Sequence, residues 1–162
     1  MVFQNPKYLI PILFGVVSIQ LLSGGVYDST TALANAAPAP TPPDKGVFTA
    51  YKGVSLGMKA ADARKALGDP KDKSDAQDFY ILSENETVQV YYEGSAVSAI
   101  SIDFAGDIKK APTCKDVLGE DVAPKPDGSI YKLLRFPKAG YWVSYNKTGG
   151  ATPLVSITIQ KL

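Results

Sequence analysis

Side chains that could carry catalytic chemistry are scarce in this 162-residue chain. It contains no His, which removes the commonest general base, the commonest metal ligand and every Ser-His or Cys-His nucleophile pair. Its one Cys, Cys114, has no partner for an internal disulfide and is interpreted as a small buried hydrophobe rather than a redox centre. No Gly-rich phosphate-binding loop occurs. We therefore expect no enzyme activity, no cofactor and no metal site, and only a Lys-based or carboxylate-only mechanism is left open.

Carboxylates are the residues that such a mechanism would use, and several Asp residues follow the first expected helix. They are Asp69, Asp72, Asp75 and Asp78. Because the Gly and the terminal Glu of an EF-hand loop are missing, a solvated polar loop is favoured over a calcium or acid/base site. Asp62 and Arg64, on the helix itself, are interpreted as part of a solvated face.

Aromatic residues offer a different chemistry, that of protein recognition. If strand residues alternate between two faces, Tyr91 and Trp142 lie opposite the core, together with Gln89 and Ser144. Tyr and Trp on an exposed polar sheet are typical anchors of protein interfaces. We predict that Tyr91, Trp142, Gln89 and Ser144 form a protein-binding site. The alternative is that the Pro-rich segment or the connection 106–112 covers one or both rings.

The strands that must position these residues are indicated by period-2 alternation. Apolar side chains recur at every second position in four segments, 88–92, 100–104, 141–145 and 155–159. Polar or small residues fill most of the positions between them, so one sheet face is expected to be apolar and the other open to solvent. Residues 93–95 and 148–150 are predicted hairpin turns.

Two short helices complete the pattern. Met58 to Leu67 is rich in Ala and has helical spacing, and Gly68 and Pro70 end it. Thr113 is a plausible N-cap for a second helix of about two turns that ends at Gly119.

An internal repeat organises these elements. Residues 63–69 (ARKALGD) align with 114–120 (CKDVLGE) at a spacing of 51, and the same spacing pairs Tyr80 with Tyr131. We therefore predict an α+β fold made of two tandem helix-plus-antiparallel-strand repeats, about 53–105 and 107–160. The repeats are expected to form one antiparallel sheet of about six strands, with both helices packed on one face. Residues 46–162 would be this single duplicated domain.

The N-terminal part predicts export. One cation, Lys7, precedes an apolar run from Tyr8 to Leu22, and small residues at 32–36 fit signal-peptidase cleavage, so residues 1–36 are predicted to be a signal peptide. If the run is counted as Tyr8 to Val26, an uncleaved anchor in the inner membrane is the alternative. Residues 37–45 (APAPTPPDK) are predicted to be a Pro/Ala-rich linker. The net charge of +1 argues against a nucleic-acid partner, and membrane contact is expected only if residues 8–26 are retained.

A family resemblance adds to this interpretation. The segments 53–70 (GVSLGMKAADARKALGDP) and 88–102 (VQVYYEGSAVSAISI) resemble the small lipoprotein of the outer-membrane β-barrel assembly machinery, an SmpA/OmlA-type domain. The resemblance covers residues 53–105 well and 113–160 weakly. The doubling of the unit is similar to that of the β-lactamase inhibitor proteins. Both families imply a protein that binds another protein and is not a catalyst.

These observations predict a periplasmic or secreted, non-catalytic protein-binding domain that acts as an envelope assembly or accessory factor. The competing hypotheses are a secreted enzyme inhibitor, which would use a concave face lined by Tyr91 and Trp142, and a membrane-anchored accessory subunit of a larger complex.

Overall fold

A computed structural model describes residues 44–162, so the predicted signal peptide, the anchor alternative and linker residues 37–43 lie outside the described part. The chain forms a seven-stranded antiparallel sheet in the order β3-β4-β5-β6-β9-β8-β7. The strands are β3 Asp72–Lys73, β4 Gln77–Ser83, β5 Glu86–Glu93, β6 Ala96–Phe104, β7 Ile130–Phe136, β8 Tyr141–Lys147 and β9 Val155–Lys161. A separate two-stranded sheet pairs β1 (Ala50–Tyr51) with β2 (Val54–Ser55).

The strand phases follow the predicted alternation. In β5, Val88 and Val90 are fully buried, and in β9 the same is true of Ile157 and Ile159. The residues between them point to the other face and are partly exposed. Because β-branched and aromatic side chains pack well on a pleated surface, these segments favour strands and bury one face.

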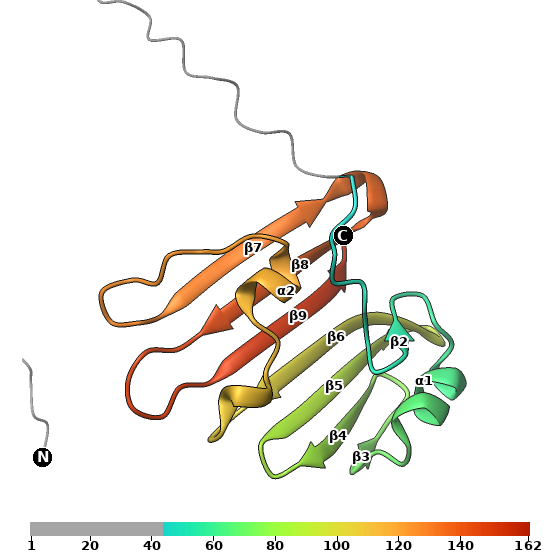
Figure 1. Cartoon of the computed structure of the whole chain (residues 1–162). Helices are drawn as coiled ribbons and strands as arrows, with labels where there is room; N and C mark the ends of the chain where they lie inside the picture. The colour runs from blue at the N-terminus through green and yellow to red at the C-terminus, as the bar shows by residue number, and fades with distance from the viewer. Residues whose placement is uncertain (1–43) are drawn as a thin grey trace, which may run out of the picture. The chain divides into compact units, whose positions relative to one another are not determined.

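Two three-stranded meanders build the large sheet. One consists of β4, β5 and β6 and the other of β7, β8 and β9, and they meet where β6 pairs with β9 in antiparallel register (Figure 1). At this seam Ser101 lies opposite Thr158 and Ile102 lies opposite Ile157. The seam therefore joins both meanders into one continuous sheet with one shared apolar face.

The helices are short. They are α1 (Ala60–Leu67) and α2 (Cys114–Leu118), with 3-10 turns η1 (Ile108–Lys110) and η2 (Pro137–Ala139). In α1 the N–H of Gly68 donates to the carbonyl of Arg64 and closes the last turn. In α2 the side chains of Thr113 and Asp116 form a capping box, and Gly119 adopts the left-handed conformation at φ 79°.

The predicted α+β fold of two helix-plus-strand repeats, with helices packed on one face, is wrong. The described chain is mostly β, with seven strands in one sheet, two in another, and helices of only eight and five residues. Much of the apolar face is instead covered by irregular chain, and Phe48, Leu56, Met58 and Val122 pack against the core from it. The apolar spacing of 58–67 and 114–118 predicts two covering helices, whereas loop residues supply much of the cover.

The predicted equivalence of Tyr80 and Tyr131 is also wrong. Tyr80 is 1 % exposed and points into the core, whereas Tyr131 is 61 % exposed. By register, Tyr80 lies opposite the buried Val88, whereas Tyr131 lies opposite Asn146 on the other face of the sheet. The connections differ in length, and a constant spacing of 51 therefore fails beyond the helices.

Within residues 44–162, no helix has both the length and the apolar character needed to span a membrane.

Candidate functional site on the open sheet face

The polar face of the large sheet arranges its side chains in rows that cross the strands. In one row Tyr91 on β5 lies opposite Ala99 on β6, Ala99 lies opposite Gln160 on β9, and Gln160 lies opposite Trp142 on β8. Three strand spacings therefore separate Tyr91 from Trp142, or roughly 14 Å between backbones. Both rings stand on the same face, with the small Ala99 between them.

The neighbouring row holds the other two predicted residues. Gln89 on β5 lies opposite Ser101, Ser101 lies opposite Thr158, and Thr158 lies opposite Ser144 on β8. The structure thus places Tyr91, Gln89, Trp142 and Ser144 on one face in two adjacent rows. We call the residues of these two rows on β5, β6, β9 and β8 the open-face site.

An open hollow lies between the two aromatic residues. It has a volume of about 680 Å³. Its lining is Ala76, Tyr91, Tyr92, Ser98, Ala99, Ser101, Trp142, Thr158 and Gln160. The lining combines small residues with the larger side chains of Tyr91 and Trp142, a composition that can receive a protruding side chain of a partner.

The open-face site is accessible in the described part of the chain. Tyr91, Trp142, Gln89 and Ser144 are all partly exposed. The connection 106–112, a predicted cover, packs Ile108 and Ala111 against the core on the opposite face instead. The Pro-rich residues 37–43, the other predicted cover, lie outside the described residues.

The face is polar but carries little charge. Its rows include the charged residues Asp72, Asp103 and Arg135, and Asp103 accepts a hydrogen bond from the Ser156 hydroxyl. The Tyr91 hydroxyl donates to the Gln89 side-chain carbonyl and links the two side chains along β5. Hydroxyl and amide groups beside aromatic rings can form hydrogen bonds and apolar contacts, but they are poor general acids or bases at neutral pH.

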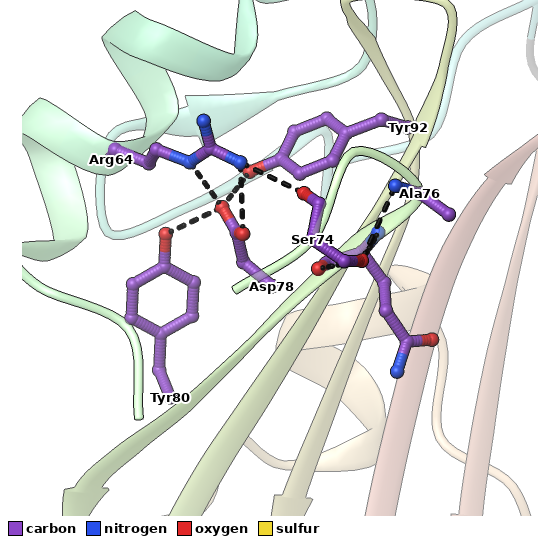
Figure 2. A network of polar contacts seen from close by, with 7 residues as sticks. Arg64, Ser74, Ala76, Asp78, Tyr80 and Tyr92 are labelled. Carbon is purple, nitrogen blue, oxygen red and sulfur yellow. Dashed lines mark hydrogen bonds and ion pairs between the residues drawn. The ribbon is translucent and has the colours of Figure 1, made fainter. Parts of the chain in front are cut away.

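A second polar cluster lies on the other side of the sheet, under α1 (Figure 2). Asp78 on β4 is fully buried, and its carboxylate accepts hydrogen bonds from Arg64 Nε at 2.7 Å and Nη2 at 3.0 Å. The hydroxyls of Tyr92 and Tyr80 donate to the same carboxylate at 2.6 and 3.3 Å. Arg64 Nη2 also donates to the carbonyl of Ser74 at 3.0 Å, so the cluster ties α1 to the start of β4.

The electrostatics of this cluster follow from burial and charge. Burial alone would raise the pKa of Asp78, but the hydrogen bonds from Arg64 and Tyr92 outweigh it and lower that pKa below its ordinary value. Burial, together with the Asp78 charge, raises the pKa of Tyr80 to about 12, and burial and the Asp78 hydrogen bond also raise that of Tyr92. Both phenols therefore stay protonated as donors at neutral pH.

Two sequence interpretations need correction here. Asp78 is part of a strand and fully buried, not part of a solvated loop, whereas Asp69, Asp72 and Asp75 are exposed. Arg64 is not simply part of a solvated face, because its guanidinium is paired with Asp78. The alternation of Asp78, Tyr80 and Leu82 at every second position could have indicated a strand with an inward-facing acid that needs a cationic partner.

The chemistry available elsewhere is limited. Cys114 is 7 % exposed, and burial raises the pKa of its thiol. Across residues 44–162, no three His, Cys, Asp or Glu side chains come together as metal ligands would. The Asp78 cluster has its hydrogen bonds made internally, so the open-face site is the better candidate for contact with another molecule.

No protein family model, curated protein sequence or solved structure matches this chain.

Proposed function

We propose that this chain is an exported, non-catalytic protein-binding domain that recognises its partner through the open-face site. The observation that carries the proposal is the shared row of Tyr91 and Trp142 on either side of a hollow of about 680 Å³. Aromatic side chains that flank a depression lined by small residues are the usual anchors of protein interfaces.

The composition of the face supports the same function. Its centre is made of Ser101, Thr158, Ser144 and Gln89, which offer hydrogen bonds without the desolvation penalty of buried charges. An antiparallel sheet ordinarily leaves one face in water, so a polar face alone is unremarkable. Trp142 and Tyr91 are what distinguish this face, because large aromatic side chains gain most from leaving water in a complex.

The predicted export and the family resemblance rest on sequence patterns alone. The predicted signal peptide at residues 1–36 favours the periplasm or the extracellular space. The resemblance of residues 53–105 to the assembly lipoprotein family stays a prediction, and it favours an envelope assembly or accessory role. We expect no cofactor.

The test is affinity purification of the protein from its native envelope. Wild type is compared with the double variant Tyr91→Ala, Trp142→Ala and with a control variant, Val47→Ala. Val47 is 65 % exposed, lies beside Gly119 at the end of α2, and does not belong to the open-face site. Circular dichroism and urea titration establish first that the three proteins are equally folded.

We expect wild type and Val47→Ala to retain the same partner and the double variant to lose it. Loss of about 2 kcal/mol or more of binding free energy, roughly thirtyfold in affinity, is typical of a central aromatic anchor. If the double variant retains the partner as well as wild type does, the open-face site is not the interface.

An enzyme-inhibitor role is the second candidate, favoured by the hollow between Tyr91 and Trp142, which could receive a protruding loop of an enzyme. The same purification separates the two: an inhibitor would capture an enzyme and lower its activity in a reconstituted assay. The anchored accessory subunit would instead be found in membranes with residues 8–26 intact.

A further inference from the structure

The two edges of the large sheet differ in how many of their backbone N–H and C=O groups are hydrogen-bonded. At one edge β3 and the turn beside it cover the first residues of β4, where the carbonyl of Phe79 accepts from Lys71 N at 2.7 Å and that of Gln77 accepts from Ser74 N at 2.9 Å. At the other edge β7 is the last strand and runs for seven residues, and no strand among residues 44–162 pairs with its outer side (Figure 1).

The hydrogen-bond phase of the sheet shows which residues of β7 face outward. Just beyond the two ends of the β8·β9 ladder, Leu162 N donates to Gly140 O at 3.0 Å and Thr148 N donates to Leu154 O at 2.9 Å. Hydrogen-bonded pairs alternate along an antiparallel ladder, so the even-numbered residues of β8 bond to β9 and the odd-numbered ones bond to β7.

The partners of those odd-numbered residues are the even-numbered residues of β7. The backbone N–H and C=O groups of Tyr131, Leu133 and Arg135 therefore point away from the sheet. No other hydrogen bond within residues 44–162 uses them. The preceding loop bonds to itself instead, with Lys125 N donating to Ser129 O at 2.8 Å.

The side chains of Arg135 and Leu133 continue the two rows of the open-face site, and that of Tyr131 continues the next row along the sheet. Arg135 lies opposite Trp142, Leu133 lies opposite Ser144, and Tyr131 lies opposite Asn146. Tyr131 is 61 % exposed and Arg135 is exposed, and Arg135 forms no ion pair among residues 44–162. An added strand would thus meet two apolar side chains and one free cation in a fixed order.

Charge argues against a second copy of this chain as the occupant. The strand β7 contains Lys132 and Arg135 and no acidic residue. If two copies paired antiparallel about Leu133, their Lys132 side chains would be diagonal neighbours on one face. Lys132 points toward the inner face of the edge strand, where it pairs with Glu120 at 3.0 Å, and inward-pointing charges of this kind discourage self-pairing of edges.

We propose that β7 is a strand-addition site that receives an extended acidic segment of the partner protein, paired antiparallel like every other strand of the sheet. The segment presents a carboxylate opposite Arg135 and apolar side chains opposite Leu133 and Tyr131, that is, an acid followed by apolar residues two and four positions later. Main-chain hydrogen bonds supply affinity, and the three side chains supply selectivity. The proposal rests on the proposed function, because it extends the open-face interface to the sheet edge.

The probe is a synthetic peptide, acetyl-Thr-Glu-Thr-Val-Thr-Phe-Thr-amide, titrated into the ¹⁵N-labelled protein. In the free protein we expect the amides of Tyr131, Leu133 and Arg135 to exchange rapidly with solvent, whereas those of Lys132 and Leu134 are protected by the ladder. The peptide should protect the first three amides and shift resonances along β7 and β8. Leu133→Pro removes one outward N–H at an edge position that tolerates Pro, and we expect it to weaken binding at least about tenfold.

A charge exchange keeps the test independent of how Leu133→Pro folds. The variant Arg135→Glu should bind the Glu peptide roughly two- to fivefold more weakly and a Lys-for-Glu peptide correspondingly better. Absence of peptide binding, binding that leaves the three outward amides unprotected, or dimerisation through β7 would each overturn the proposal. The proposed function is judged separately by the Tyr91 and Trp142 variants, so either can fail without the other.

Discussion

Asp78 is the one charged residue that is fully buried among residues 44–162. Its side chain is fully buried, and a buried carboxylate is tolerated only when charge and hydrogen bonds compensate for lost hydration. Arg64 supplies the charge, and Tyr80 and Tyr92 supply two further donors. The Arg64 side chain is 25 % exposed, so the pair lies at the border of the core, where the guanidinium keeps contact with water.

We predict that Asp78→Asn lowers the free energy of unfolding at neutral pH by about 3 kcal/mol. The amide keeps the size of the side chain but leaves the Arg64 cation without its counter-charge and one phenol without a good acceptor. Urea titration followed by circular dichroism measures the loss. The matched control is Asp75→Asn in the exposed turn, which we expect to change stability by less than about 0.5 kcal/mol.

The pH dependence of stability distinguishes the loss of the Asp78 charge from a loss of packing. Because the fold lowers the pKa of Asp78, its stabilisation is complete above the unfolded pKa of about 3.9 and is lost as the pH falls through the lower folded value. The difference between wild type and Asp78→Asn should therefore shrink in acid. A difference that stays constant down to about pH 2 would show that the charge of Asp78 is not the cause.

At the scale of elements, the period-2 alternation of apolar residues predicts a strand and its inward face wherever that strand buries only apolar side chains. It predicted the inward faces of β5, β6, β8 and β9 correctly, and with them the common face of Tyr91 and Trp142. It failed for β4, because the inward Asp78 looks like a loop residue until its partner Arg64, fourteen positions earlier, is known. Neither the two-residue strand β3 nor the free edge of β7 has a local signal, because both depend on which strands become neighbours.

We predict that Thr113→Ala lowers stability by about 1 kcal/mol. The helix α2 has only five residues, and its capping box satisfies backbone N–H groups at Thr113 and Asp116 that would otherwise lack partners. Thermal or urea unfolding measures the change. Thr152→Ala, at an exposed position in the β8–β9 connection, is the matched control. Equal effects of the two substitutions would mean that the capping box contributes nothing.

At the scale of the whole molecule, both meanders share one core through the seam of β6 and β9. Ile157 on β9 lies opposite Ile102 on β6 and opposite Tyr145 on β8, and all three side chains are buried. An open sheet whose two halves bury the same apolar face is expected to unfold in a single transition. The seam also sets the distance between Tyr91 and Trp142, one from each meander, on which the open-face site depends.

The substitution Ile157→Ala tests whether the two meanders unfold together. Ile157→Ala should lower stability by about 2–5 kcal/mol, because it removes a fully buried side chain and leaves a cavity at the seam. If the meanders unfold together, native-state hydrogen exchange should report the same loss for the most protected amides of β5 and of β8. The control Ile81→Ala, at a position that is 55 % exposed, should change both by much less. A loss confined to β8 would mean that the meanders unfold separately, and the geometry of the open-face site would then depend on a partner to hold it.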